Sequence, residues 1–262
     1  MNEFSKIANE IRYEICKMSH EARAAHLGSS LSCVDILVAI FFGNIFNLSK
    51  NNKNKDKFIL SKGHAAAALY SILAKKNYFN KRKLKTYGKN NSFFEEHPNT
   101  KIKGVICSTG SLGHGLSFGA GICLAEKIEN KNFKTIVLLS DGECNEGSVW
   151  EAAGFASAQK LNNLIVIVDY NKWQATGRTK SIVGGDLLKK WKSFGWNGFE
   201  INGHNINQIL RTLVKAKKSQ KPTALVANTI KGKGIKFMED DNNWHYRIPT
   251  KEELNKIKYI LK

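Results

Sequence analysis

The feature that most constrains the fold is a set of short apolar segments separated by amphipathic stretches. Residues 135–139, 164–168 and 223–227 are almost wholly aliphatic, with no alternation of polar and apolar side chains. A strand with one face in water alternates, whereas a strand buried on both faces does not. The pattern therefore predicts an α/β fold with a central parallel sheet and helices on both of its faces.

The other elements are predicted from hydrophobic periodicity and from turn residues. Two further strands are expected at residues 58–60 and 199–201. Residues 88–111 are polar enough to form a long loop, and residues 51–55 form a low-complexity surface loop. Helices are expected at residues 4–18, 31–45, 65–75, 114–128, 147–159, 187–194 and 207–217.

The length of 262 residues is enough for one large domain or two small ones, and a hydrophobic content of 42% indicates a globular chain. Residues 1–12 contain no signal-peptide core. The longest apolar run, residues 36–46, is interrupted by Gly43 and Asn44 and is shorter than the roughly 20 residues of a membrane helix. The five cysteines include no CxxC pair, which argues against a disulfide framework or structural zinc. We therefore expect a cytoplasmic protein with no membrane partner.

The charge is strongly unbalanced, with 41 Lys and Arg against 22 Asp and Glu and a net charge of +19. Such an excess is typical of nucleic-acid binders. The lysines are dispersed, however, and no recognition helix, zinc finger or stacking motif accompanies them. The alternative is a solvated lysine surface whose field attracts sugar phosphates or an acidic partner. We expect no nucleic-acid partner.

Two of the apolar segments end in polar residues that suit a metal ion. Asp141 and Gly142 follow residues 135–139, and Asn171 follows residues 164–168. The carboxyl ends of parallel strands face one crevice, where a carboxylate and an amide oxygen suit Mg²⁺ or Ca²⁺. The helix that begins near Glu146 points its positive end at the same place. Singly, Asp141 is explained as a helix N-cap and Asn171 as a turn residue; together they favour a metal and phosphate site.

The chain resembles the transketolase family of thiamine diphosphate enzymes. Asp141-Gly142, 28 intervening residues and then Asn171 is similar to the cofactor fingerprint of that family. Further blocks resemble transketolase in the family's order, namely ARAAHLGSSLSCVDIL, LSKGHAAAALYS, EEHPN, STGSLGHGLSFGAG and KGKGIKFMEDDNNWH. The resemblance covers nearly the whole chain. It implies that residues 1–262 form a single diphosphate-binding domain of the thiamine diphosphate-binding fold. Some bacteria encode this domain as a separate N-terminal subunit.

The resemblance also implies roles for individual residues. Asp141 and Asn171 would bind the metal ion by their side chains, and Trp173 by its backbone carbonyl. Glu146 and Glu151 match carboxylates that lie near the dimer interface of the family. The residues implied as catalytic are His26, His64, His97 and His245. Those implied in cofactor binding are His64, Gly110, Leu112, Asp141, Gly142, Glu146, Asn171 and His245.

The histidines also suit the implied chemistry on their own. Imidazole gives and takes protons near neutral pH, and the reaction moves protons on and off sugar hydroxyls. The other three, His20, His114 and His204, are interpreted as core, surface or helix-cap residues.

Two positions depart from the family pattern. Ser140 replaces the first glycine of the usual Gly-Asp-Gly, and we expect this small residue to be tolerated. Leu27 follows His26 where many full-length transketolases have proline. We expect this change to affect the local loop and the substrate preference.

The implied active site is incomplete in this sequence. Lys262 follows soon after the block that contains His245, and no second βαβ array is present. The pyrimidine-binding and C-terminal domains of the family are therefore expected on a partner chain, with two copies of each chain. The implied reaction is thiamine diphosphate-dependent transfer of a two-carbon ketol unit from a ketose phosphate to an aldose phosphate.

Two other interpretations stay open from the sequence. The chain could belong to another thiamine diphosphate enzyme, of the 2-oxo acid dehydrogenase alpha type or the deoxyxylulose phosphate synthase type. The block LSKGHAAAALYS and the pair Trp244-His245 favour transketolase. A non-catalytic scaffold that kept the fold is disfavoured because the implied site residues are intact, namely Asp141, Asn171, His64 and His245.

Overall fold

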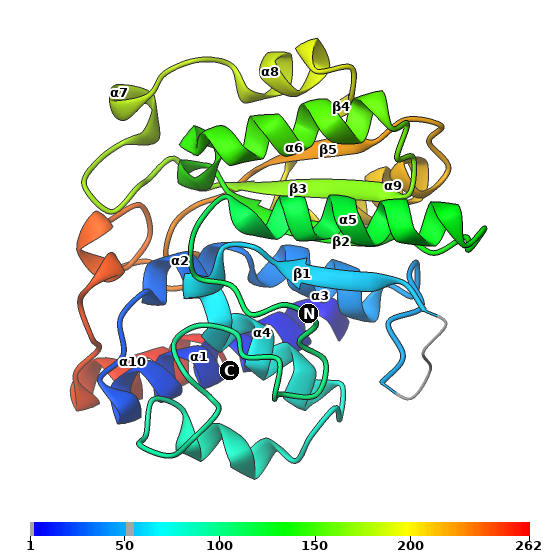
Figure 1. Ribbon diagram of the computed structural model, residues 1–262. Helices are drawn as coiled ribbons and strands as arrows, with labels where there is room; N and C mark the ends of the chain where they lie inside the picture. The colour runs from blue at the N-terminus through cyan, green and yellow to red at the C-terminus, as the bar shows by residue number, and fades with distance from the viewer. Residues whose placement is uncertain (1–2, 51–54) are drawn as a thin grey trace.

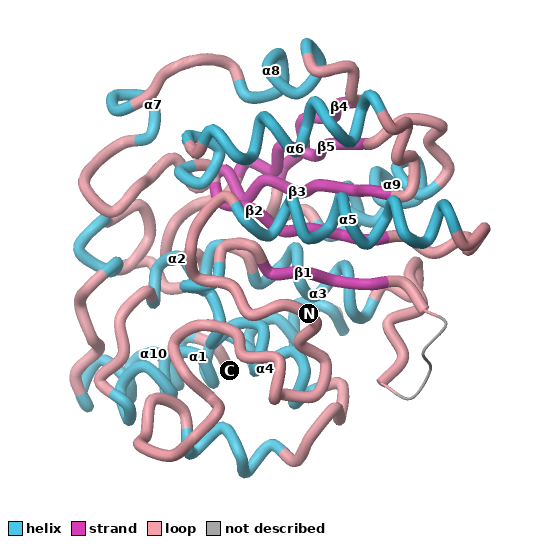
Figure 2. Tube along the Cα trace, in the orientation of Figure 1, coloured by secondary structure: helices cyan, strands magenta, loops and turns pink. Residues whose placement is uncertain are grey.

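The chain folds around one parallel sheet, as the apolar segments predicted (Figures 1 and 2). The computed structural model describes residues 3–50 and 55–262, so the expected loop at residues 51–55 lies outside it except for Lys55. Within the described residues the sheet has the order β1-β2-β3-β5-β4, and every pair is parallel. The strands are β1 (Lys57–Leu60), β2 (Thr135–Ser140), β3 (Leu164–Tyr170), β4 (Asn197–Asn202) and β5 (Thr223–Asn228).

Helices cover both faces of the sheet, which confirms the predicted fold class. The helices α5 (His114–Ile128), α6 (Gly147–Ala158) and α8 (Leu187–Ser193) lie on one face (Figure 1). The opposite face is covered by α1 (Glu3–Ala22), α3 (Val34–Phe42), α4 (Ala66–Lys75) and α9 (Ile206–Lys217). Because successive side chains of a strand point to opposite faces, β2 sends Val137 and Leu139 into one core, and Ile136 and Leu138 into the other.

The helix expected at residues 31–45 is wrong in its bounds, since two helices lie there. These are α2 (Leu27–Ser32) and α3 (Val34–Phe42), separated at Cys33. The Ser32 hydroxyl donates to the carbonyl of Ser29 over 3.0 Å and to Asp169 over 2.6 Å. Serine hydroxyls that bond nearby backbone groups compete with a regular helix, and we attribute the break at Cys33 to these bonds. A hydropathy pattern does not reveal such bonds, because serine is nearly neutral on a hydropathy scale.

Several short elements were not expected. They are the 3₁₀ turns η1 (Gly63–Ala65), η2 (Lys81–Thr86), η3 (Gly142–Asn145) and η4 (Asn242–His245), and the helices α7 (Thr179–Ile182) and α10 (Lys251–Ile260). The start of α10 is legible in the sequence, because Thr250 and Glu253 form a capping box. Single-turn elements carry too little periodicity to be found in this way.

Two general expectations can be compared with the described residues. All five cysteines are free thiols. Across residues 3–50 and 55–262, no helix combines the length and apolar character needed to cross a bilayer.

Candidate functional site

Two neighbouring strands place Asp141 and Asn171 at the same edge of the sheet. β2 and β3 pair with Ser140 opposite Asp169, so the chain leaves both strands at the same level. The backbone N–H of Lys172, next to Asn171, donates to Asp141 Oδ2 over 2.9 Å. Both Asp141 and Asn171 are buried. The structure thus brings these two residues together at the strand ends.

The carboxylate of Asp141 has one oxygen in use and one without a partner. Oδ2 accepts hydrogen bonds from Lys172 N and, over 2.6 Å, from the Thr179 hydroxyl. Oδ1 is buried and accepts no hydrogen bond. Burial raises the pKa of Asp141 to about 6, because desolvation disfavours the charged form. A buried carboxylate oxygen without a donor fits a cation.

Two hydrogen bonds hold the Asn171 amide in place at this edge of the sheet. Its Oδ1 accepts from the backbone N–H of Trp173 over 3.0 Å, and its Nδ2 donates to Ser32 Oγ over 3.4 Å. The oxygen donors of Asp141 and Asn171 suit Mg²⁺ or Ca²⁺. In the described part of the chain, no three His, Cys, Asp or Glu side chains gather as a metal cluster. The residues present therefore fit a hard ion that takes its other ligands from elsewhere, such as a diphosphate.

A buried ion pair supports this edge from below, and the sequence did not reveal it. Lys62 Nζ lies 2.5 Å from Asp169 Oδ2, and both side chains are fully buried. Lys62 also donates to the carbonyl of Ser29 over 2.9 Å, and Asp169 accepts from Ser32 and Thr229. This network ties the ends of β1 and β3 to α2. The signal available in the sequence was a lysine two residues after the apolar segment that forms β1.

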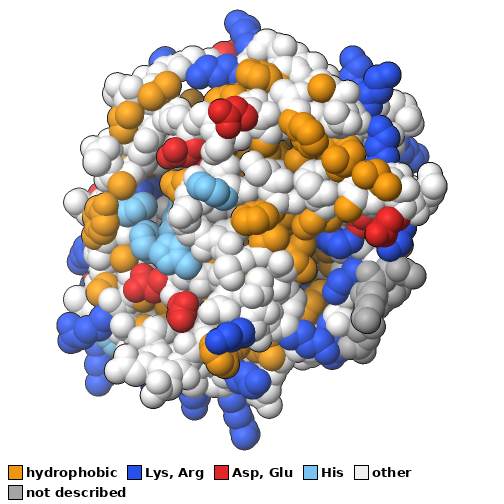
Figure 3. Space-filling view, in the orientation of Figure 1, with side chains coloured by type: hydrophobic (Ala, Val, Ile, Leu, Met, Phe, Trp, Pro, Cys, Tyr) orange, Lys and Arg blue, Asp and Glu red, His pale blue; other side chains and the backbone are white. Residues whose placement is uncertain are grey.

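Four predicted histidines meet in one cavity of about 310 Å³ above this edge. The ring centroid of His26 lies 5.6 Å from that of His64, 6.0 Å from that of His97 and 5.1 Å from that of His245. Figure 3 shows histidine side chains gathered on this face, beside acidic groups. The cavity thus joins residues from four separate segments of the chain.

The environment of these histidines keeps three of them neutral. Burial lowers the pKa of His26, although Glu96, 3.5 Å away, acts to raise it. Burial, aided by the nearby Lys62 charge, holds the pKa of His64 well below its ordinary value. Burial also lowers the pKa of His245 to about 3. Neutral imidazoles can accept or donate hydrogen bonds to sugar hydroxyls and can take up a proton.

A second buried lysine orients His245. Lys231 Nζ lies 3.2 Å from His245 Nδ1 and 2.6 Å from Asn242 Oδ1. An ammonium group only donates, so Nδ1 of His245 accepts and its Nε2 carries the proton. Burial lowers the pKa of Lys231 to about 8. The sequence analysis missed Lys231, because in sequence it is one of many lysines.

Most of the other predicted residues line the same cavity. Its walls include Gly110, Leu112, Gly142, Glu146 and Trp173, together with the unpredicted Ser29, Ser140, Gln174 and Ala175. Asp141 lies buried beneath them. Glu151 lies outside, on the exposed side of α6. The roles assigned to these residues stay predictions, since the structure shows their positions.

The three histidines that were not predicted to be functional form hydrogen bonds with nearby groups of the protein. His204 Nδ1 lies 2.8 Å from Asp35, and its Nε2 accepts from the backbone N–H of Ile230. His20 contacts the carbonyl of Pro249, and the exposed His114 contacts that of Leu112.

The two departures from the family pattern have clear structural places. The Ser140 hydroxyl accepts from the backbone N–H of Glu143 over 3.2 Å, and Ser140 N donates back to Glu143 Oε2. Glu143, unpredicted and buried, also accepts from Ser61 and from Gly113 N. Leu27 is the buried first residue of α2, directly after His26.

Comparison with known proteins agrees with this geometry. The family model described as "Transketolase, thiamine diphosphate binding domain" matches residues 4–261. One of the subunits of the apulose-4-phosphate transketolase of Actinobacillus succinogenes is 40% identical over 258 residues, covering 97% of this chain and 94% of that protein. The same-named protein of Phocaeicola vulgatus is 36% identical over 246 residues, covering 92% of this chain and 88% of that protein.

Solved structures agree as well. The transketolase of Campylobacter jejuni superimposes with a TM-score of 0.92 at 29% identity, covering all of this chain and 43% of that one. The match therefore spans less than half of that larger enzyme. Together with the family model and the two relatives, it shows that the chain belongs to the transketolase family, as a thiamine diphosphate-binding domain.

Proposed function

We propose that this chain is the metal- and diphosphate-binding subunit of a two-chain transketolase. The complete enzyme would transfer a two-carbon ketol unit from a ketose phosphate to an aldose phosphate. The observation that carries the proposal is the unpartnered, buried Oδ1 of Asp141 beneath a cavity lined by four histidines. A cation site and proton-exchanging groups in one cavity are what this chemistry requires.

In this proposal, some residues of the chain hold the metal ion and others contact the cofactor. Asp141 and Asn171 hold Mg²⁺ by their side chains, and Trp173 holds it by its carbonyl. Gly142 and His64 form the diphosphate side of the cofactor site, and Gly110 and Leu112 form its pyrimidine side. Glu146 and His245 complete the cofactor site. Thiamine diphosphate, when bound, supplies the electron sink that lets a carbon–carbon bond beside a carbonyl break and form.

The histidines would handle the hydroxyl protons of the sugar. His26, His64 and His245 are kept neutral by burial, so each can accept a proton or a hydrogen bond. The proton on Nε2 of His245, fixed by Lys231, leaves that atom as a donor to a sugar oxygen. His97 completes the ring of imidazoles around the cavity.

A second, partner chain is part of the proposal. The cavity of about 310 Å³ is at the lower end of the range for small-molecule sites, as expected when a second surface closes over it. Both apulose-4-phosphate relatives are named as subunits of their enzymes. Residues 1–262 would then be one diphosphate-binding domain, with the pyrimidine-binding half on the partner. The five free thiols support a reducing cytoplasmic location.

Two copies of each chain would form the assembly. The outer side of α5 and α6 exposes Phe118 by 49%, Ile128 by 72% and Phe155 by 42%. Figure 3 shows apolar side chains spread over this part of the face. We name the exposed side of these two helices the α5–α6 face. Apolar surface of this kind favours burial against another molecule, and an isologous contact would pair two copies.

The test combines the chain with its candidate partner chain, thiamine diphosphate and Mg²⁺. Apulose 4-phosphate is the first donor to assay, because two relatives are named for it. We expect ketol transfer by the pair and none by either chain alone. Asp141→Asn should abolish activity, whereas Asp186→Asn, at the exposed N-cap of α8, should keep it. Full activity of Asp141→Asn would refute the metal assignment.

A further inference from the structure

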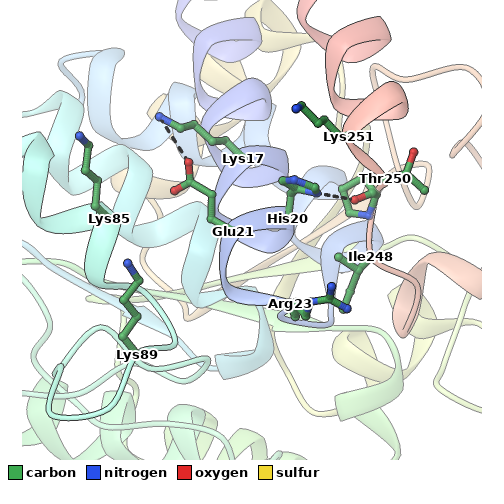
Figure 4. Close-up of a pocket in the computed structure, with 10 residues that line it drawn as sticks. Lys17, His20, Glu21, Arg23, Lys85, Lys89, Ile248, Thr250 and Lys251 are labelled. Atoms are coloured by element: carbon green, nitrogen blue, oxygen red, sulfur yellow. Dashed lines mark hydrogen bonds and ion pairs between the residues drawn. The ribbon is translucent and has the colours of Figure 1, made fainter.

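A second cavity, of about 830 Å³, is separate from the one lined by His26, His64, His97 and His245, and half of its lining residues are lysines or arginines (Figure 4). It lies where the end of α1, the end of η2 with the segment after it, and the start of α10 meet. We name it the α1–α10 pocket. Its charged walls are Lys17, Arg23, Lys85, Lys89, Lys251 and one carboxylate, Glu21. The proposed function uses none of these residues.

The positive charge of this pocket is not balanced by the protein. Glu21 lies 3.8 Å from Lys17. In the described residues, Arg23, Lys85, Lys89 and Lys251 form no ion pair. Neighbouring lysines outside the pocket are paired, since Lys75 and Lys81 contact glutamates of α1. Crowded like charges repel each other, so this arrangement favours an external anion.

Backbone contacts fix the walls of the pocket. Gly88 has a φ of +65° and lies so close to α1 that a Cβ there would be 2.9 Å from Ala22 Cβ. This approach holds Lys89 beside the end of α1. Arg23 has a φ of 53°, which is unusual for a side chain of this size. On the other side, His20 Nδ1 donates to the carbonyl of Pro249 over 2.7 Å and joins α1 to the start of α10 (Figure 4).

We propose that the α1–α10 pocket binds a small molecule that carries two or more phosphate groups. The cations come from three separate segments around a cavity of about 830 Å³, which is more space than a single phosphate fills. The volume is within the range of small-molecule sites. Arginine forms bidentate bonds with phosphate, and lysines add point charges. A phosphate chain therefore matches both the extent and the charge of this surface.

Binding here would connect two segments that also carry active-site histidines. Arg23 precedes His26 by one short turn, and Ile248 follows His245 closely. The backbone N–H of His26 donates to the carbonyl of His245 over 2.7 Å. A ligand that bridges both sides of the pocket would hold these segments in one arrangement. The site is therefore placed to regulate the histidine cavity.

The test uses calorimetry with sodium tripolyphosphate on the full chain in EDTA, which removes metal from the Asp141 site. We expect one bound tripolyphosphate per chain. Lys85→Ala/Lys89→Ala should weaken binding by at least about tenfold. The control Lys215→Ala/Lys218→Ala removes the same charge from the exposed side of α9 and should change the dissociation constant by less than about twofold. Circular dichroism and melting curves confirm that each variant is folded.

Several outcomes would overturn the proposal. They are no stoichiometric binding by the wild-type chain, equal weakening in both double variants, or unchanged binding in Lys85→Ala/Lys89→Ala. Arg23→Ala is a second, independent variant that should also weaken binding. Inorganic phosphate that binds as tightly as tripolyphosphate would exclude the need for two groups. ATP binding tighter than tripolyphosphate would assign the ligand to nucleotides, and equal binding would assign it to the phosphate chain alone.

Discussion

Two aspartates at adjacent strand ends show how the surroundings of a side chain decide whether it stabilises the fold or is suited to bind a ligand. Asp169 is fully satisfied by Lys62, Ser32 and Thr229. Asp141 has one oxygen without a donor and a raised pKa. An unsatisfied buried oxygen is costly unless a ligand completes it. Asp169 is therefore a structural residue, whereas Asp141 is suited to bind a cation.

Asp141→Asn should separate ligand binding from stability. The neutral amide removes a buried charge whose desolvation destabilises the fold, so the melting temperature without ligand should stay the same or rise. Thiamine diphosphate with Mg²⁺ stabilises a binding protein by about 2.7 kcal/mol at a hundred times its dissociation constant, and the variant should lose this gain. Differential scanning fluorimetry with and without ligand measures both effects.

Asp169→Asn is the comparison for that experiment. It leaves Lys62 buried without its partner, so the unfolding free energy should fall by about 3–5 kcal/mol even without ligand. If ligand raised the melting temperature of Asp141→Asn as much as that of the wild type, Asp141 would not be a metal ligand.

For single residues, the sequence predicted the site side chains that follow strand ends or lie in family blocks. It missed the buried charged side chains that hydrogen-bond around them. Asp141, Asn171 and the histidines were found because strand ends and family blocks mark them. Glu143, Lys62 and Lys231 were not, although all three are buried. A charged residue is usually exposed, so only the folded structure shows which charged side chains are buried.

At the scale of elements, a buried charge cluster joins pieces that are distant in sequence. Asp35 of α3 accepts from Arg12 of α1 over 2.6 Å and contacts His204, between β4 and α9. Arg12 also donates to the carbonyl of Lys233 over 3.0 Å. The cluster fixes the packing of the helices on the side of the sheet opposite α5 and α6.

Asp35→Asn should lower stability in a pH-dependent way. Burial alone would raise the pKa of Asp35, but hydrogen bonds from His204 and Arg12 outweigh it and lower that pKa. A lowered pKa stabilises the fold above the unfolded value of about 3.9, and this contribution is lost as pH falls below it. Urea unfolding should show a loss of about 3–5 kcal/mol at pH 7 and a smaller loss at pH 3. Equal losses at both would contradict this account.

Gly63→Ala should disturb the approach of η1 to the loop that precedes α5. A Cβ at Gly63 would lie 2.7 Å from Gly110 N and from Thr109 C, which are backbone atoms. Overpacking of this kind costs about 1–3 kcal/mol, and the shift of His64 should weaken cofactor binding. Urea unfolding and cofactor titration measure the two effects.

Gly154→Ala is the matched control for Gly63→Ala. Its Cβ would meet only the Phe194 ring, at 3.7 Å, within the helix α6. Alanine stabilises a helix interior relative to glycine by up to about 1 kcal/mol, so this variant should be at least as stable as wild type. A Gly63→Ala protein as stable as this control would show that the contact is not tight.

The elements that the sequence predicted well are those with long, regular patterns. The sheet strands and α5, α6 and α9 were predicted nearly at their bounds. The single helix at residues 31–45 failed because Ser32 bonds to Ser29 and Asp169 in place of helix continuity. Asp169 lies far along the chain, so no local pattern could reveal that competition.

At the scale of the whole molecule, apolar and charged surfaces are separated. The α5–α6 face is apolar, whereas the α1–α10 pocket carries unpaired cations. The net charge of +19 could be read from the sequence, but the concentration of five of the cations around one cavity could not. That concentration depends on three segments that meet only in the fold.

Phe118→Asp should prevent two copies of this chain from pairing through the α5–α6 face. A carboxylate in a buried apolar contact loses its hydration without a partner. Sedimentation velocity of the complex should show one copy of this chain where the wild type shows two. Phe93→Asp is the control, because Phe93 is 50% exposed, against 49% for Phe118, but lies in the loop before α5. Dissociation of both variants, or of neither, would place the pairing surface elsewhere.

The strand order has a consequence for how the chain reaches its native state during synthesis. Lys57 of β1 pairs with Thr135 of β2. β1 therefore cannot form its pairing until α4, the long loop and α5 have been synthesised. β4 cannot join the sheet until β5 has been synthesised, because β5 lies between β4 and β3. Such long-range parallel pairings are slow to form and leave strand edges open meanwhile. A ribosome-bound fragment that ends before β5 therefore holds β4 without a neighbour, and a chaperone that shields strand edges has its target there.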